Sequence, residues 1–338
     1  MANNIAFAKN YTGILDEVYQ KASVSAVLNS GRRMVRAGRS AKEIMIPKIS
    51  VSGLGDYERN VGYKTGSINY EFETKTFNYD RGIRLMADVM DVEEGGVLDC
   101  FVEAGAELER TQVAPEADAF TFAQIAGHTG VAAETCDMRE AEGADVLAKL
   151  REVTGAMDEA QVSTASRILF ITPTLKGAVD DFSLANPARS NRVLERFARV
   201  VEVPQARFWT AIDLLSGGDD GFGYQPAAGS YVKTADTELA SGKTYYTRDS
   251  DIYVAVASPT KSGLANYYEL ADAGAPINFM VVEKSAVIKF DKHVTSRVFT
   301  PDELESLDSY MMKYRKYGIV ELFDNKLAGV HVSVGTGQ

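Results

Sequence analysis

The sequence is poor in the residues that usually mark a disulfide scaffold or a metal site. Its 338 residues include two cysteines, Cys100 and Cys136, and three histidines, His128, His293 and His331. Two cysteines cannot staple a chain of this length, and their spacing differs from the paired spacing of a zinc site. The histidines form no H-E-x-x-H grouping. We therefore predict two unpaired thiols in a reducing compartment, no bound metal and no cofactor.

Long apolar runs and a signal-like start are also missing. No stretch approaches the roughly 18 consecutive apolar residues that a membrane-spanning helix needs. Residues 1–10 have no cationic region followed by an apolar block, which is the pattern of a signal peptide. We expect no contact with a membrane.

The charge of the chain is negative overall but unevenly distributed. Residues 1–50 contain eight Lys or Arg against three Asp or Glu and carry +5, whereas the whole chain carries −11. An acidic body disfavours tight wrapping of nucleic acid, because affinity for phosphate comes mainly from Lys and Arg. The segment Arg32–Arg39 is the one plausible contact for a polyanion. The alternative interpretation is a basic helix end that pairs with acidic neighbours.

The first half of the chain reads as an arm, a hairpin and a long helix. In residues 1–42, Ile14, Val18, Ala22 and Ala26 share one helical face, which is too weakly apolar to fold alone. From residue 43 to about 91, strand-like alternation on both sides of a glycine-marked stretch predicts a two-stranded hairpin with one apolar face, which another surface must cover. Val97, Phe101, Ala104 and Leu108 then predict a helix from about 92 to 126, with an interruption at Pro115.

The second half reads as mixed α/β with an interruption. We predict a helix over 144–159, a buried strand over 167–172, a helix after Pro173 and a strand near 200–203. Residues 214–276 are rich in Gly, Ser, Thr and Tyr and predict a small inserted β module. Strands over 277–283 and 285–290 should follow, then a helix from Asp302 to Tyr317 and a final pair of strands.

The motifs of common enzyme chemistry are absent from the sequence. Ser241–Thr244 ends like a phosphate-binding loop, but Thr237 stands where its first glycine belongs. No G-x-S-x-G elbow presents a nucleophilic serine. We therefore predict that the chain is not an enzyme.

Several local phrases, taken in order, resemble a known family. They include Ile46-Pro47-Lys48-Ile49, Gly53-Leu54-Gly55-Asp56-Tyr57, Tyr79-Asp80-Arg81-Gly82, Met86 to Asp91, Ala114 to Ala119, Leu169 to Pro173, Val201 to Pro204, Ile277 to Met280 and Tyr310 to Tyr317. In this order they resemble the major capsid proteins of tailed bacteriophages with the Hong Kong phage capsid fold. The phrases span nearly the whole chain outside residues 214–276.

The resemblance implies an α+β fold and a structural role. Its expected parts are an N-terminal arm (1–42), an extended hairpin loop (43–91), a spine helix and peripheral domain (92–141), a first part of an axial domain (142–213), an inserted β module (214–276), and the rest of the axial domain with C-terminal peripheral strands (277–338). The subunit would self-assemble through hexamers and pentamers into an icosahedral virion shell around double-stranded DNA, which it touches non-specifically. Assembly would take place in the cytoplasm of a bacterial host. A separate scaffolding protein and a portal are the further partners implied.

The resemblance also places the subunit interface at the hairpin tip and the basic arm. The residues that we expect there are Gly53, Gly55, Asp56, Tyr57, Arg59, Lys64, Arg32, Arg33 and Arg36. Some relatives cross-link a hairpin lysine to an asparagine on a neighbour. Lys64 or Lys75 with Asn278 or Asn325 are the candidates here, although no motif marks such a pair.

The sequence is also compatible with two other functions. An encapsulin-like nanocompartment would share the fold but enclose a protein cargo instead of DNA. A soluble α/β enzyme would purify as a small oligomer with measurable turnover.

Overall fold

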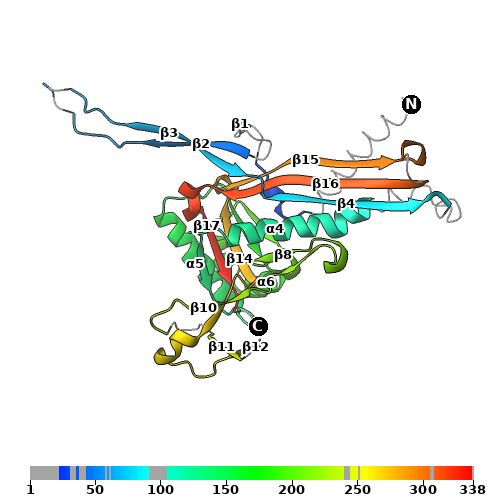
Figure 1. Ribbon diagram of the computed structural model, residues 1–338. Helices are drawn as coiled ribbons and strands as arrows, with labels where there is room; N and C mark the ends of the chain where they lie inside the picture. The colour runs from blue at the N-terminus through cyan, green and yellow to red at the C-terminus, as the bar shows by residue number, and fades with distance from the viewer. Residues whose placement is uncertain are drawn as a thin grey trace. The chain divides into compact units, whose positions relative to one another are not determined.

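The computed structural model describes residues 23–30, 36–37, 43–57, 59–60, 62–90, 105–239, 244–249, 252–304 and 308–336 (Figure 1). The chain divides into two compact units by its internal contacts. Among the described residues, the first unit contains those within Ala26–Glu107 and Val287–Glu321, and the second contains those within Tyr19–Ser25, Leu108–Ala286 and Leu322–Gln338. The predicted arm helix lies almost wholly outside the described residues.

The first unit holds two three-stranded sheets. One has the order β1-β2-β3, with strands β1 (Arg36–Ala37), β2 (Glu43–Val51) and β3 (Ile68–Thr76). The other has the order β15-β16-β4, with strands β15 (Val287–Phe299), β16 (Ser309–Leu322) and β4 (Tyr79–Asp88). The predicted hairpin is confirmed as β2 and β3, but its pairing ends at Thr76, and β4 belongs to the other sheet.

The helix predicted from Asp302 to Tyr317 is wrong. A helical turn does begin at Pro301, and the Thr300 N–H donates to Glu303 Oε2 at 3.2 Å, as at a helix start. This turn, Pro301–Glu303, is only three residues long. β16 follows from Ser309 and pairs with β4 in antiparallel register. Its side chains alternate, so that Tyr314 is buried while Lys313 is exposed. The pairing partner β4 lies far earlier in the sequence, where a local pattern cannot reveal it.

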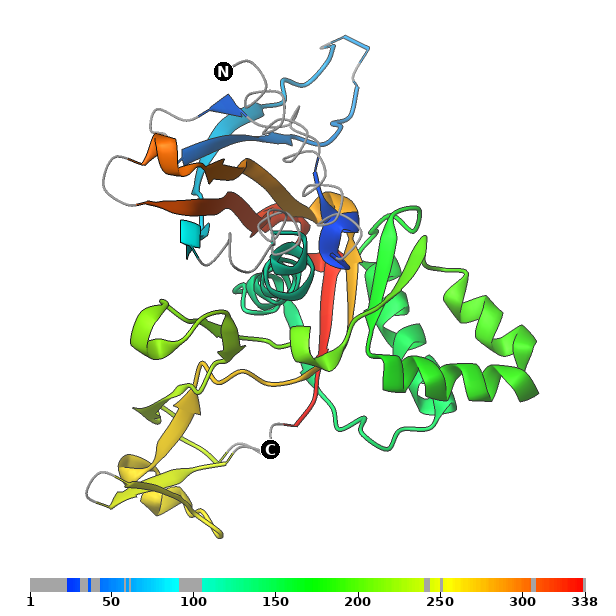
Figure 2. The same cartoon turned by 90° about the vertical axis from the view of Figure 1, so that its right-hand side faces the viewer.

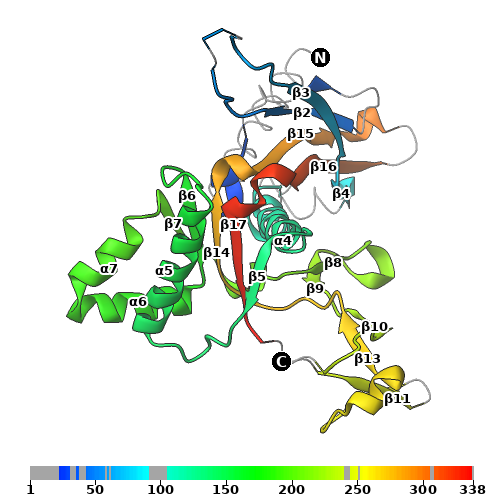
Figure 3. The same ribbon diagram turned by 90° about the vertical axis from the view of Figure 1, so that its left-hand side faces the viewer.

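The second unit is built on a five-stranded mixed sheet. Its order is β5-β17-β14-β6-β7, with strands β5 (Ala132–Thr135), β17 (Val330–Val334), β14 (Ile277–Glu283), β6 (Arg167–Ile171) and β7 (Arg199–Glu202). Helices α5 (Gly143–Glu159), α6 (Pro173–Ala185) and α7 (Pro187–Leu194) lie along one side of it (Figure 3). The helices and strands predicted over 144–203 are confirmed.

Both faces of this sheet are covered, as the packing of β6 shows. Successive side chains of β6 point to opposite faces of the sheet. Leu169 and Ile171 pack into the core that α5 and α6 complete. Phe170 faces the other way and meets Phe122 of helix α4 (Ala114–Ala126), with ring centroids 5.1 Å apart. Burial on both faces explains why β6 reads as a continuous apolar run.

The predicted spine helix is described from residue 105 onward, and Val97, Phe101 and Ala104 lie outside the described residues. A π-helical turn, Glu109–Val113, precedes α4. The Ala114 N–H donates to the Glu109 carbonyl within this turn. Pro115 follows this widened turn and lies in the first turn of α4, where the missing N–H of proline does not break the helix.

Residues 212–271 of the second unit form two small sheets. Strands β8 (Ile212–Leu214) and β9 (Tyr224–Pro226) make a hairpin. The four-stranded sheet has the order β10-β13-β11-β12, with strands β10 (Ser230–Lys233), β13 (Tyr268–Ala271), β11 (Tyr246–Asp249) and β12 (Ile252–Ala255). This sheet has a separate hydrophobic core, which consists of Tyr245, Leu264 and Tyr267. The β strands predicted for this segment are confirmed.

Candidate subunit interface

The β2–β3 hairpin is a narrow ribbon that extends away from the β15-β16-β4 sheet of the same unit (Figure 1). Its register runs without a bulge from Glu43 opposite Thr76 to Val51 opposite Ile68. The ribbon closes at Ser52, whose N–H donates to the Ser67 carbonyl at 3.0 Å, while the Ser67 N–H donates to Ser52 Oγ at 2.6 Å. These bonds separate a regular ribbon from a tip loop over residues 53–66.

One face of the ribbon is apolar and exposed. Because directly opposed residues share a face, Ile49 lies beside Tyr70, and Val51 beside Ile68. The exposed fractions are 57% for Ile49, 66% for Val51, 75% for Ile68, 52% for Tyr70 and 43% for Phe72. The Tyr70 and Phe72 rings meet edge to face at 5.1 Å. A continuous apolar strip of this kind on an extended ribbon is typical of a binding surface.

On β3, the opposite face of the ribbon is polar, and it is tied to β16 at its base. Asn69 Nδ2 donates to Glu71 Oε1 at 2.6 Å. Lys75 Nζ lies 2.9 Å from Glu73 Oε1 and 3.5 Å from Glu321 Oε2 at the end of β16. The ribbon is therefore amphipathic along β3, and the ion pair between Lys75 and Glu321 links its base to β16.

The tip loop carries most of the residues that we predicted for the interface. A Cβ atom on Gly55 would lie 3.4 Å from Lys64 Cβ, so the structure brings these two predicted residues together. The rings of Tyr57 and Tyr63 lie 4.9 Å apart. The predicted tip residues Gly53, Gly55, Asp56, Tyr57, Arg59 and Lys64 are all exposed.

The predicted basic residues do not gather with the tip. Arg36 lies in β1 opposite Met45, at the base of the ribbon. Arg32 and Arg33 lie outside the described residues. The role of all the predicted residues in an interface stays a prediction.

The predicted site residues did not include the apolar face of the ribbon. The signal was present in the sequence, where Ile68, Tyr70 and Phe72 alternate with Asn69, Glu71 and Glu73. The same pattern predicted that another surface must cover this face, but the predicted interface residues were taken from the tip and the basic arm.

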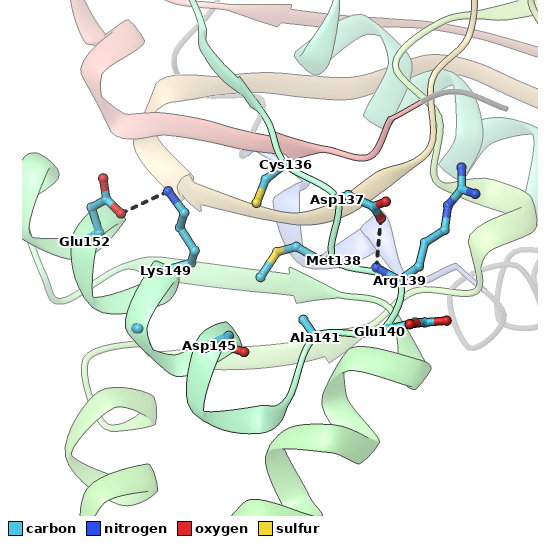
Figure 4. Close-up of a pocket in the computed structure, with 10 residues that line it drawn as sticks. Cys136, Asp137, Met138, Arg139, Glu140, Ala141, Asp145, Lys149 and Glu152 are labelled. Carbon is cyan, nitrogen blue, oxygen red and sulfur yellow. Dashed lines mark hydrogen bonds and ion pairs between the residues drawn. The ribbon is translucent and has the colours of Figure 1, made fainter. Parts of the chain in front are cut away.

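A groove in the second unit has a volume of about 820 Å³ and lies beside the start of α5 (Figure 4). Its lining includes Cys136, Met138, Arg139 and Lys149. Hydrogen bonds from Lys149 to Glu134 and Glu152 raise the pKa of this lysine, which is therefore a fixed cation and not a general base.

The described part of the chain also lacks a metal-binding cluster and a membrane-spanning helix. Across it, no group of three or more His, Cys, Asp or Glu side chains is arranged to hold a metal ion. No helix in the same residues combines the length and apolar character needed to cross a membrane.

Comparison of the sequence with known proteins gives no match, either to a family model or to a curated protein. Comparison of the structure gives many. The capsid structure of the cyanophage P-SCSP1u matches at 13% identity with a TM-score of 0.52, covering 92% of this chain and 87% of that one. The mature capsid of bacteriophage PhiM1 matches at 14% identity with a TM-score of 0.52, covering 88% of this chain and 83% of that one.

The chain has the Hong Kong phage capsid fold. A virus-like particle from Pyrococcus furiosus also has a similar structure, at 8% identity and a TM-score of 0.53, covering 97% of this chain and 99% of that one. The predicted α+β capsid fold is thereby confirmed in its overall form. The predicted domain boundaries stay predictions.

Proposed function

We propose that this chain is a major capsid subunit that self-assembles into the icosahedral shell of a tailed phage. The capsid fold supports this proposal, and the apolar face of the β2–β3 ribbon is the observation that carries it. Ile49, Val51, Ile68, Tyr70 and Phe72 are exposed in the single chain. Burying such a face on another copy yields roughly 25 cal/mol per Å² of apolar area before the costs of association. Many copies of one such contact close a shell.

The partners of the subunit follow from this function. The copies form hexamers and pentamers, and a separate scaffolding protein and a portal take part in assembly in the bacterial cytoplasm. The packaged DNA touches the shell non-specifically, because the chain outside its first 50 residues has a net negative charge of −16 (−11 − 5).

Electron microscopy and light scattering of the purified chain test the proposal. The wild-type chain should form rings or closed shells, with scaffold supplied where it is required. Tyr70→Asp places a charge in the middle of the apolar face and should abolish shells while leaving the circular dichroism spectrum unchanged. Asn69→Lys is the control, because it places a charge on the polar face of the same strand, beside the carboxylate of Glu71.

The outcomes separate assembly from folding. A chain that stays monomeric at high concentration with scaffold present contradicts the capsid function. Normal shells from Tyr70→Asp would show that the ribbon face is not an intersubunit contact.

A shell that encloses protein is the second candidate, and the similarity to the Pyrococcus furiosus particle over nearly the full length of both chains favours it. The contents of particles from an infected or expressing cell decide between the two. Nuclease-protected DNA supports the phage capsid, whereas a protein cargo without nucleic acid supports the compartment.

A further inference from the structure

A glycine-rich loop between β8 and β9 presents a phenylalanine to solvent. Phe222 is 70% exposed. The loop is closed by two backbone bonds of 3.0 Å, from the Leu215 N–H to the Gly223 carbonyl and from the Gly217 N–H to the Gly221 carbonyl. Its glycines have positive φ values, at Gly217 (89°), Gly218 (71°), Gly221 (81°) and Gly223 (95°). Only glycine adopts these values readily, so the sequence itself builds the loop shape.

A second exposed apolar surface lies where α6 passes into α7. Leu184 is 86% exposed, and the residues that follow it are also exposed. They are Ala185, Asn186, Pro187 and Ala188. Pro187 begins α7, which fixes the turn between the helices. The corner Leu184–Ala188 is therefore a small apolar surface on a rigid support.

The loop and the corner lie on opposite flanks of the second unit. Views from opposite sides agree on this arrangement, with α6 and α7 at one edge and the β8–β9 hairpin across the five-stranded sheet from them (Figures 2 and 3). Phe222 therefore cannot reach the Leu184 corner of its own chain.

The loop is acidic, and the α7 side of the corner is basic. Residues 215–223 contain Asp219 and Asp220 but no Lys or Arg, and Asp219 is exposed. On the α7 side of the corner, residues 187–194 contain Arg189 and Arg192 but no Asp or Glu, and Arg192 is exposed. On the α6 side, Asp180 forms an ion pair with Lys176, and Asp181 is exposed. The acidic loop with its aromatic tip thus complements the α7 side of the corner.

We propose that Phe222 of one copy packs on the Leu184–Ala188 corner of the next copy, with Asp219 facing Arg192. Since the two surfaces differ and lie on opposite flanks, the contact is head to tail, and a repeated head-to-tail contact closes into a ring when the rotation permits. The inference rests on the proposed function, for which it names the residues that join neighbours within one ring. A pre-shaped loop suits this role because little conformational freedom is lost on binding.

Charge insertion at each surface is the first test, using the full-length chain. Phe222→Asp and Leu184→Asp should each raise the concentration needed for rings by more than about tenfold, as expected for a central aromatic or apolar anchor. Light scattering measures this, and circular dichroism confirms the fold. Ile252→Asp is the control, because Ile252 is 68% exposed in β12, away from both surfaces.

A mixture of the two variants tests the head-to-tail geometry. Phe222→Asp retains an intact corner, and Leu184→Asp retains an intact loop, so an equimolar mixture can form one good contact and should stop at heterodimers. Both variants are made in a Tyr70→Asp background, which removes the ribbon contact, so either variant alone should stay monomeric. Failure of the mixture to form heterodimers would overturn the geometry.

Charge reversal tests the register of the contact. Asp219→Arg and Arg192→Asp should each raise the concentration needed for rings several-fold. The double variant should bring that concentration most of the way back to the wild-type value. If wild-type chains form shells and every variant assembles equally well, this contact is wrong while the capsid function stands. If wild-type chains form neither rings nor shells, the proposed function fails and this contact fails with it.

Discussion

Asp118 of α4 accepts hydrogen bonds from both the backbone N–H and the hydroxyl of Ser25, at 3.1 and 2.5 Å. The same carboxylate accepts bonds from the Ser23 hydroxyl at 2.6 Å and the Val24 N–H at 3.0 Å. Arg207 Nη1 lies 3.1 Å from Oδ2 of Asp118, the oxygen that also accepts from the Val24 N–H. Asp118 is fully buried, so five donors compensate for the loss of water around its charge. The carboxylate thereby fastens the segment Ser23–Ser25 to the second unit.

Asp118→Asn should destabilise the fold by about 3 to 5 kcal/mol, because it removes the ion pair with Arg207 and points an amide N–H₂ at existing donors. Urea unfolding followed by circular dichroism measures the free energy. Asp181→Asn is the control, since the exposed Asp181 lies on α6 and its change should stay within about 0.5 kcal/mol. Equal effects from the two variants would mean that the Asp118 network contributes nothing specific.

Two glycines of α5 should respond in opposite directions to substitution by alanine. A Cβ on Gly143 would lie 2.2 Å from the Ala178 carbonyl oxygen and 2.7 Å from Phe182 Cβ, so α5 and α6 would have to separate. Gly143→Ala should cost about 1 to 3 kcal/mol. Gly155 has no heavy atom within 4 Å of its Cβ position, so Gly155→Ala should stabilise the helix by about 0.5 to 1 kcal/mol. Thermal unfolding of the two variants in parallel gives both signs.

Removal of the four-stranded sheet should leave the rest of the second unit folded. Ser230 and Ala271 are paired across β10 and β13, so a short Gly-Ser linker can replace the residues between them. Tyr245, Leu264 and Tyr267 form a separate core that leaves with the deleted segment. The thermal transition of the shortened chain should stay within a few degrees of the wild type. Insoluble expression would show that the sheet supports the larger core.

The free energy of unfolding should fall as the pH drops below about 6.5 because of His331. Burial lowers the pKa of His331 from its ordinary value of 6.5, while Glu134 and Glu152 act weakly in the opposite direction. The unfolded chain therefore takes up a proton at a higher pH than the folded chain, which favours unfolding in acid. His331→Gln should flatten this part of the profile measured by urea unfolding, whereas His293→Gln should retain it. Identical profiles for all three chains would assign the pH dependence to other groups.

The sequence predicts those parts of the fold that depend on neighbouring residues. The alternation of Ile68, Tyr70 and Phe72 predicted the ribbon, and Pro173 marked the start of α6 correctly. β16 was missed because its identity as a strand depends on pairing with β4, which lies more than 200 residues earlier. Met312 and Tyr314 are spaced as in a strand, but Pro301, which is typical of a helix start, outweighed that pattern.

The candidate interface shows the same division. The glycines Gly53 and Gly55 located the tip, because glycine clusters mark turns. The exposure of Ile49 and Val51 depends on whether another part of the chain covers them, which no local pattern records. The Leu184 corner and Phe222 were not predicted either, since a single exposed Leu or Phe has the same sequence signature as a buried one.

β17 is the last of the five strands of the central sheet in chain order, so the sheet is completed only after β17 has been synthesised. β17 lies between β5 and β14 and pairs with both of them. Until the ribosome has added residue 334, β5 has no partner in the sheet and the edge of β14 is open, with unpaired backbone groups. Closing this gap joins segments that are nearly 200 residues apart, which is slow compared with forming α5 or α6. Nascent chains that end before β17 therefore lack the completed sheet that lies between the β8–β9 loop and the Leu184–Ala188 corner. Premature association of such chains on polysomes is disfavoured.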